Sequence, residues 1–450
     1  MKKNIDLLNG NILKSLTELA LPIMATSLVQ TAYNLTDMAW IGRVGSEAVA
    51  AVGAGAMYTW LSTGVVTLAR MGGQVKSAHA YGEGNHREAV RYGKGALQLA
   101  LLLAAVYGIL TNVLAGPLIG FFHLNSAKVV GDAIVYMRIA CGLIVFAFIG
   151  QTLTGLYTAS GNSRTPFIAN CIGMGANIIL DPLLIFGLGP IPGMGVAGAA
   201  IATVSAQFIV SLVLLMSMRK DPLLSEQVRI WIPTPLSNIK TMVRIGLPAA
   251  VQSMLYCFIS MVLTRFVTSW GDTAVAVQRL GGQVESISWM TAEGFGTAIN
   301  AFVGQNYGAG NLKRVKKGYI TASFIMFIWG TLTTLLLIFG AAPIFSVFIQ
   351  EPEVIPVGAN YLRIIGFSEM FMCLELMTVG AMSGMGKTME ASVITIILTA
   401  ARIPLAILLG GTSMGLDGIW WALTISSIVK GIIFFTVFLR MMRKWDRQIA

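Results

Sequence analysis

Two aspartates lie inside long apolar segments of this chain, and each has an asparagine one helical turn before it. Asp37 follows Asn34 by three residues and Asp181 follows Asn177 by four, so each pair shares one face of a helix. A charge within the hydrocarbon of a membrane costs at least about 2.5 kcal/mol, which makes such residues candidates for function. Removal from water favours the protonated form of a carboxyl group, and a second carboxylate nearby favours it further. The chemistry expected of Asp37 and Asp181 is therefore the uptake and release of a proton.

Two prolines lie in the same apolar segments as these aspartates. Pro182 directly follows Asp181 and removes the hydrogen bond to the carbonyl of Ile178, which predicts a kink and a spare acceptor. Pro22 predicts a bend low in the first segment. Both prolines would adapt the backbone close to the two acids.

The second half of the chain carries a larger set of charged residues inside apolar segments. These are Glu285, Glu293, Glu369, Glu375, Arg402 and Lys430. Glu285 and Glu293 are eight residues apart, about 80° around a helix, so they flank one polar stripe. Arg402 forms either a buried ion pair with Glu369 or Glu375, or part of an ion-binding site. We favour a structural role for Glu369 and for Lys430.

Composition identifies the elements that must hold these residues. Of the 450 residues, 55% are hydrophobic and only 11% are charged, which excludes an ordinary soluble protein. The apolar runs predict twelve membrane-spanning helices, and hence an all-α integral membrane protein. These helices lie near residues 16–40, 48–72, 91–120, 132–157, 164–188, 194–218, 240–268, 276–302, 315–346, 357–382, 391–411 and 418–441.

The basic residues give the chain an orientation. The formal net charge is +11, and most of the Lys and Arg residues lie on one side of the predicted spans. They occupy the two termini and the segments 73–94, 158–164, 219–244 and 303–317, with Lys387. The positive-inside rule then places both termini in the cytoplasm of a multi-pass protein of the inner or plasma membrane. Lipid-flanking loops explain this charge, so we expect no nucleic-acid partner.

The sequence repeats itself at a constant spacing. Leu21-Pro22 recurs as Leu247-Pro248, and the loop that begins at Ala80 recurs from Asn306, both 226 residues later. Tyr136 and Gly161 recur in the same way as Tyr361 and Gly386. Because six helices separate the copies, both halves enter the membrane in the same direction. We therefore predict two pseudo-symmetric six-helix lobes, residues 1–218 and 240–450, joined by a cytoplasmic linker at 219–239.

Motifs for other chemistries are absent from the sequence. The four cysteines form no CxxC pair, and no His stands near them to complete a metal site. The chain has no Walker sequence, no HExxH and no GxSxG, and its GxG clusters lie in charged loops. An intramembrane enzyme would need a nucleophile with a base or a metal, so we expect neither an enzyme nor a bound metal.

Six motifs, taken in order, resemble the multidrug and toxic compound extrusion (MATE) family, in its DinF-like branch. They are the ALP of residues 20–22, NLTDMAWIGRVG ending at Gly45, GNSRTPF from Gly161, NIILDPLLIFG from Asn177, GVAGAAIAT from Gly195 and FVGQNYGAGN from Phe302. The resemblance covers essentially all twelve spans. It implies two six-helix lobes around a central cavity, alternating access, and efflux of organic cations against H⁺ or Na⁺.

The resemblance also implies roles for individual residues. The motifs of DinF-like members place the coupling acids at Asp37 and Asp181, with Asn177, Tyr136 and Thr203 in support. Thr154 stands where many relatives have Asn. The Glu that NorM-like members carry in the seventh span is missing, and Tyr256 lies near that place. This departure favours H⁺ over Na⁺, although Glu369 and Glu375 leave Na⁺ open.

We therefore expect a monomeric proton-coupled antiporter of lipophilic cationic small molecules, with no tightly bound cofactor. A Na⁺-coupled antiporter is the first alternative. A flippase for lipid-linked precursors is the second, but it would need a cationic cavity, whereas the acids of the first lobe make its cavity acidic.

Overall fold

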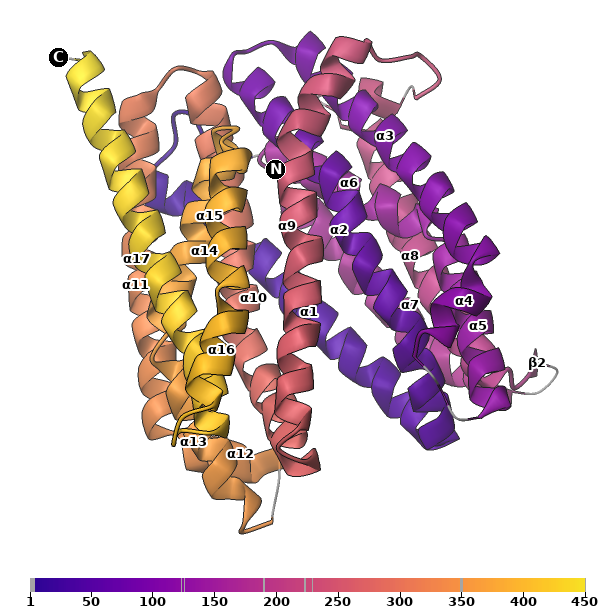
Figure 1. Cartoon of the computed structure of the whole chain (residues 1–450). Coiled ribbons are helices and arrows are strands. Elements are labelled where there is room, and N and C mark those ends of the chain that lie inside the picture. The colour runs from indigo at the N-terminus through magenta and orange to yellow at the C-terminus, as the bar shows by residue number, and fades with distance from the viewer. Residues whose placement is uncertain are drawn as a thin grey trace. The chain divides into compact units, whose positions relative to one another are not determined.

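Helices make up nearly all of the computed structural model, which describes residues 5–122, 124, 126–188, 191–221, 224–228, 230–348 and 351–449 (Figure 1). The α-helices are α1 (Ile12–Val44), α2 (Ser46–Gly82), α3 (His86–Val113), α4 (Ala115–Gly120), α5 (Ala127–Gly142), α6 (Val145–Ala159), α7 (Arg164–Ile185), α8 (Gly195–Arg219), α9 (Leu236–Thr268), α10 (Asp272–Gly308), α11 (Leu312–Phe339), α12 (Ala341–Phe348), α13 (Val354–Gly366), α14 (Glu369–Gly384), α15 (Thr388–Ala400), α16 (Arg402–Gly410) and α17 (Leu416–Ile449). A 3-10 turn, η1 (Ser225–Val228), and an antiparallel hairpin of β1 (Gly187–Leu188) and β2 (Ile191–Pro192) complete the elements.

Each of the twelve predicted spans corresponds to one long helix or to two consecutive shorter ones. Within the described residues, nine helical segments are long and apolar enough to cross a membrane, among them Thr388–Gly410, which joins α15 and α16. Two further spans are bent pairs, α5 with α6 at 44° and α13 with α14 at 47°. The remaining long helix, α10, is interrupted by Glu285 and Glu293 and is too polar to qualify by composition. The predicted all-helical membrane fold is thus confirmed.

The repeat extends to the backbone. Helix α10 begins and ends 226 residues after α2, and α11 begins and ends 226 residues after α3. The turn before each of α3 and α11 contains a glycine with φ of +70°, Gly84 and Gly310. The next residue but none, Asn85 or Asn311, caps the helix by accepting a hydrogen bond from the backbone N–H three residues on. The two copies therefore use the same local chemistry to turn the chain.

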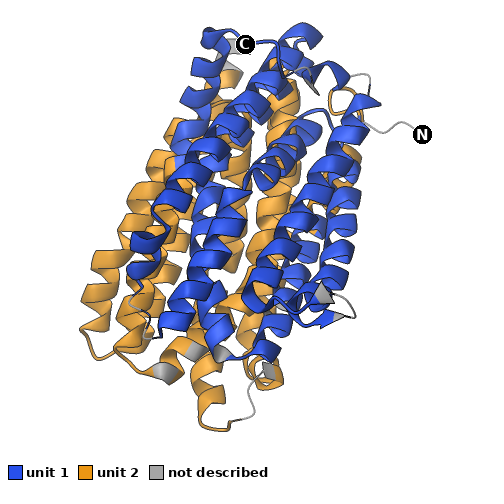
Figure 2. Ribbon diagram, turned by 90° about the vertical axis from the view of Figure 1, so that its right-hand side faces the viewer, with its two compact units in different colours: residues 1–5, 25–250 blue, residues 6–24, 251–450 orange. Residues whose placement is uncertain are grey.

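The chain divides into two compact units, which Figure 2 colours separately. Unit 1 contains residues 1–5 and 25–250, and unit 2 contains residues 6–24 and 251–450. The division falls within α1, two residues after Pro22, and within α9, two residues after Pro248. The lobes predicted from the repeat divide the chain once, at the linker, whereas the compact units also divide these two helices.

Close backbone packing explains why the first parts of α1 and α9 are separated from the rest. Gly294 of α10 packs on Met24 at the end of the first part of α1, within unit 2. Gly246 of α9 packs directly on the backbone of Leu68 in α2, within unit 1. At both places the absence of a side chain on glycine lets two helices approach closely.

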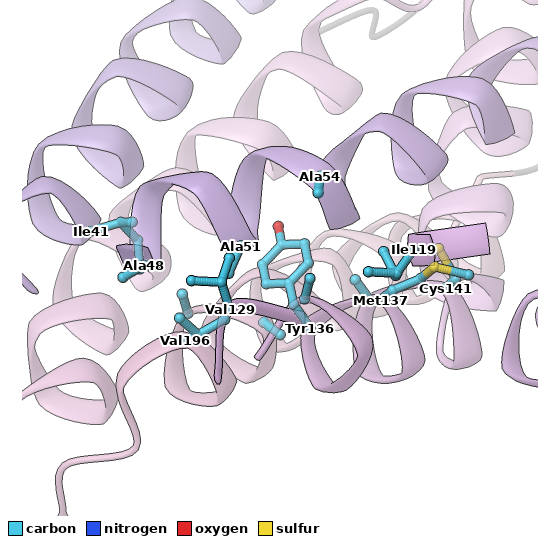
Figure 3. Close-up of a cluster of buried hydrophobic side chains, with 14 of the residues drawn as sticks. Ile41, Ala48, Ala51, Ala54, Ile119, Val129, Tyr136, Met137, Cys141 and Val196 are labelled. Carbon is cyan, nitrogen blue, oxygen red and sulfur yellow. The ribbon is translucent and has the colours of Figure 1, made fainter. Parts of the chain in front are cut away.

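The core of unit 1 contains a cluster of buried side chains around Tyr136 of α5 (Figure 3). Its ring lies beneath Ala51 and Ala54 of α2, and its hydroxyl points toward that helix. Gly55 of α2 makes this approach possible, because a Cβ there would lie 2.6 Å from Cδ1 of Tyr136. In unit 2 the equivalent Gly281 packs in the same way against the ring of Tyr361.

A buried ion pair joins α14 to α17 in unit 2. Lys430 Nζ lies 2.8 Å from Oε1 of Glu375, and both side chains are almost completely buried. The second carboxylate oxygen of Glu375, Oε2, accepts no hydrogen bond from any described residue. Each charge in this pair therefore depends on the other, because neither is exposed to water.

Replacement of Gly55 by alanine should destabilise the protein. The new methyl group would overlap the ring of Tyr136, and overpacking of this kind costs about 1–3 kcal/mol. The matched control is Gly53→Ala, two residues earlier on α2, where the added methyl group meets no atom within 4 Å. We expect a lower midpoint of thermal unfolding in detergent for Gly55→Ala alone. Equal midpoints for the two variants would contradict the packing described here.

Replacement of Lys430 by methionine should be strongly destabilising, because it leaves the Glu375 carboxylate buried without a counter-charge. The expected cost is about 3–5 kcal/mol in the free energy of unfolding. The double variant Lys430→Met/Glu375→Leu removes both charges and should recover most of that loss. The measurement is the fraction of protein that remains monodisperse after heating, and a double variant no more stable than Lys430→Met would disprove the pairing.

Candidate functional site

The first candidate site is formed by three helices of unit 1. Asp181 and Asn177, both on α7, are completely buried, and Asn177 Nδ2 donates a hydrogen bond to Asp181 Oδ1 at 3.3 Å. This is the contact that their spacing of four residues predicts. Asp37 reaches the same place from α1, and its carboxyl group lies within hydrogen-bonding reach of that of Asp181. Two aspartates 144 residues apart in sequence therefore meet inside the unit.

The two carboxyl groups lack donors for part of their hydrogen-bonding capacity. Asp37 Oδ1 and Asp181 Oδ2 are buried and accept no hydrogen bond from the described residues. Two adjacent carboxylates repel each other when both are charged, whereas a single shared proton supplies a donor between them. Among the described side chains, the arrangement is one that favours binding of a proton or another cation.

Two tyrosines lie close to the pair. Tyr136 is buried beside both acids, as the family resemblance implied. Tyr33 of α1 is near both acids as well, and its hydroxyl donates a hydrogen bond to Thr203 Oγ1 at 3.2 Å. Our sequence analysis named Thr203 but missed Tyr33. The signal was present, because Tyr33 precedes Asp37 by four residues and so shares its helix face.

Two predicted supporting residues make their hydrogen bonds elsewhere. Asn34 is exposed, and its Oδ1 accepts a hydrogen bond from Gln30, one turn earlier on α1. Thr154 donates to the carbonyl of Gly150 in its own helix, α6. Pro22 lies inside α1, which continues through it as one helix from Ile12 to Val44. Of the predicted group, the structure brings together Asp37, Asp181, Asn177, Tyr136 and Thr203.

The second candidate site lies in unit 2 and has a different composition. Arg402 is buried at the start of α16 and donates from Nε to Ser426 Oγ at 3.2 Å and from Nη2 to Ser427 Oγ at 2.9 Å. It also interacts with the side chains of Tyr256 and Glu285. The expected partnership of Arg402 with Glu375 is wrong, because Glu375 is paired with Lys430.

The remaining acids of unit 2 have separate environments. Glu285 is half-buried and hydrogen-bonded to Tyr361, the repeat equivalent of Tyr136. Glu369 is completely buried and faces Glu285, and neither of its carboxylate oxygens accepts a hydrogen bond of good geometry from a described residue. Glu293 is exposed on α10. The polar stripe predicted for Glu285 and Glu293 therefore contributes one residue, Glu285, to the cluster.

The two sites share a tyrosine but not their acids. Tyr136 and Tyr361 occupy equivalent positions against equivalent glycines, whereas the carboxyl groups come from α1 and α7 in unit 1 and from α10 and α14 in unit 2. No group of three His, Cys, Asp or Glu side chains in the described part of the chain is placed to hold a metal ion. The chemistry that both sites can perform is exchange of a proton or a monovalent cation.

Comparisons with known proteins agree with this architecture. The MatE family model matches residues 22–183 and 248–408, one match in each half of the repeat. A probable multidrug resistance protein NorM of Thermotoga maritima is 28% identical over 446 residues, covering 97% of this chain and 94% of that protein. A FAD transporter of Shewanella oneidensis is 26% identical, covering 96% of this chain and 95% of its own length.

Solved structures show the same fold. A crystal structure of a MATE protein in complex with MaL6 superposes with a TM-score of 0.91 over 99% of this chain and 100% of that one, at 23% identity. The family matches cover both halves of the chain and most of its spans. The chain therefore belongs to the MatE family, whose members include multidrug efflux transporters of the membrane.

Proposed function

We propose that this chain is a proton-driven antiporter that exports lipophilic organic cations by alternating access. The observation that carries this proposal is the contact between Asp37 and Asp181, in which each carboxyl group keeps one buried oxygen without a donor. A shared proton satisfies this pair, whereas the deprotonated pair has a negative charge with few partners. That charge is what a lipophilic cation would bind.

Competition between the proton and the organic cation then couples their movements. Facing the cytoplasm, the deprotonated pair attracts the cation into the lobe. Facing outward, protonation cancels the attraction, rearranges α1 and releases the cation. The coupling requires that the cation bind the two protonation states with different affinities, since equal affinities would shift no equilibrium.

The orientation and setting complete the proposal. We assign both termini to the cytoplasmic side of an inner or plasma membrane, because the basic loops lie on that side of the predicted spans. We take the monomer as the working unit and H⁺ as the coupling ion, with no tightly bound cofactor. The motifs that contain Asp37 and Asp181 favour the DinF-like branch of the family.

Sodium coupling is the first alternative, and Glu369 is the observation that favours it. This buried carboxyl group accepts no hydrogen bond of good geometry from a described residue, and Glu285 faces it. A Na⁺ ion between two carboxylates would satisfy both. Transport that requires a Na⁺ gradient would favour this alternative.

Anionic substrates are the second alternative, since one relative is a FAD transporter and a flippase would carry a pyrophosphate. A dinucleotide or a lipid pyrophosphate needs a cationic site. Arg402 is the buried cation of unit 2, but Ser426, Ser427, Tyr256 and Glu285 already surround it. FAD itself is fluorescent, so both substrate classes can be tested in one assay.

Asp37→Asn should abolish transport driven by a pH gradient. Proteoliposomes loaded with rhodamine 6G, a fluorescent lipophilic cation, report its movement under an imposed pH gradient without Na⁺. We expect the flux to fall at least about tenfold in Asp37→Asn and in Asp181→Asn, because an amide cannot exchange the proton. The matched control is Asp132→Asn on α5, outside the cluster, which should keep the wild-type flux. Wild-type flux in folded Asp37→Asn would remove this pair from the mechanism.

Glu369→Gln should leave the same proton-driven flux within about twofold of wild type, because the proposed coupling lies in unit 1. The variant keeps the shape of the side chain and removes only its ability to ionise. The same vesicles are then given a Na⁺ gradient in place of the pH gradient. Flux that appears only with Na⁺ and is lost in Glu369→Gln would overturn proton coupling and move the site to unit 2.

A further inference from the structure

A short segment between the lobes exposes an unusual number of large apolar side chains outside any membrane-spanning helix. In the sequence IWIPTPL, residues 230–236, the side chain of Trp231 is 75% exposed and that of Leu236 is 81% exposed. Ile230 and Ile232 are also exposed. The proposed transport mechanism uses none of these residues, so their exposure needs another explanation.

The backbone of this segment is held firmly against α3 of unit 1. Gln98 Nε2 donates hydrogen bonds to the carbonyls of Ile230 and Ile232 at 2.7 and 2.8 Å, and its Oε1 accepts one from the backbone N–H of Thr234 at 3.2 Å. One amide side chain thus spends both of its donor hydrogens and its acceptor on the segment. The exposure of Trp231 is therefore fixed by structure.

Contacts on both sides extend this attachment. Before the segment, Gln227 is buried and donates to the hydroxyl of Tyr81 at 3.0 Å. After it, Asn238 donates to Glu88 Oε2 at 3.0 Å. Figure 1 shows the connection from α8 to α9 running beside the first turns of α3. The segment is a built part of unit 1.

The position of Gln98 on α3 sets the depth of the segment in the membrane. Exposed apolar residues follow it along one face of the helix at spacings of three or four: Leu102, Val106, Ile109 and Val113. Such a face is the one that contacts lipid. Gln98 stands one turn, about 6 Å, before Leu102 on that face. The segment that crosses Gln98 therefore lies at the boundary between hydrocarbon and headgroups, where tryptophan is favoured.

Basic side chains lie close to the segment in the chain. Lys240 and Arg244, four residues apart on α9, are both exposed and follow Leu236 within about two turns. Helix α3 begins with Arg87 and Arg91 in the same basic region. An apolar anchor flanked by positive charge fits a membrane surface that contains acidic phospholipids.

We propose that residues 230–236 form an interfacial anchor that binds acidic phospholipid in the leaflet on the side of the basic loops. Trp231 and Leu236 enter the boundary of the acyl chains, and Lys240 and Arg244 bind lipid phosphate. This inference requires only that the chain spans a membrane, and so it does not depend on which substrate or coupling ion is used. Its consequence is that the connection between the lobes is held at a constant depth.

The first test measures the depth of Trp231 by fluorescence quenching. The full-length chain is placed in lipid nanodiscs that contain phosphatidylcholine brominated either near the headgroup or near the chain end. The difference between wild type and Trp231→Phe isolates one of nine tryptophans. We expect the shallow bromines to quench this difference signal more strongly than the deep ones. The control is Trp420→Phe, since Trp420 is fully buried and its signal should respond to neither lipid.

The second test measures the dependence on lipid charge. Addition of phosphatidylglycerol should increase the quenching of Trp231 by shallow bromines. Lys240→Gln/Arg244→Gln should weaken this response roughly tenfold in phosphatidylglycerol concentration, because each basic residue contributes to binding of the acidic surface. The matched control is Lys313→Gln/Lys317→Gln, an exposed pair with the same spacing on α11, which should leave the Trp231 signal unchanged.

One result would overturn the proposal. If iodide in the water quenches the Trp231 signal while brominated lipids of both kinds leave it unchanged, the segment lies in water. The exposed apolar residues would then be available to a partner protein and would not bind lipid. A shallow signal that is indifferent to phosphatidylglycerol would keep the anchor and overturn its preference for acidic lipid.

Discussion

A carboxyl group buried among membrane-spanning helices needs a donor, a counter-ion or a proton, and this requirement explains how the polar residues of the protein are arranged. Glu375 meets it permanently through Lys430. Asp37 and Asp181 meet it only in part, because each keeps a buried oxygen without a donor. A permanently satisfied acid stabilises one packing of the helices, whereas a partly satisfied acid responds to what binds it. The difference separates a structural charge from a candidate coupling charge.

The repeat shows which features both halves need. The glycine turns at Gly84 and Gly310 are kept because a positive φ reverses the chain in the same place twice. The packing of Tyr136 and Tyr361 against glycine is kept because two close helices leave room for nothing larger. The acids are not kept, since each one costs free energy in the membrane and persists only where something binds it.

The sequence was sufficient to predict the spans, the repeat and the contact of Asn177 with Asp181, because these depend on hydropathy and on helical spacing within one segment. It did not predict the pairing of Glu375 with Lys430 or the place of Arg402 beside Ser426. Those contacts join different helices and depend on how each helix is rotated about its axis, which hydropathy alone does not specify. The division of α1 and α9 between two compact units was missed for the same reason.

The two clusters also differ in how much of their charge is balanced. In the repeat, Arg402 stands where unit 1 has Asn177, and Ala406 stands where it has Asp181. Unit 2 thus replaces an amide and an acid by a cation, which interacts with Glu285, while Lys430 balances Glu375. The described cations of unit 1 do not pair with Asp37 or Asp181. Deprotonation of that pair therefore creates an unbalanced negative charge in unit 1, whereas in unit 2 the same step at Glu369 adds its charge beside the Glu285 carboxylate and is opposed by it.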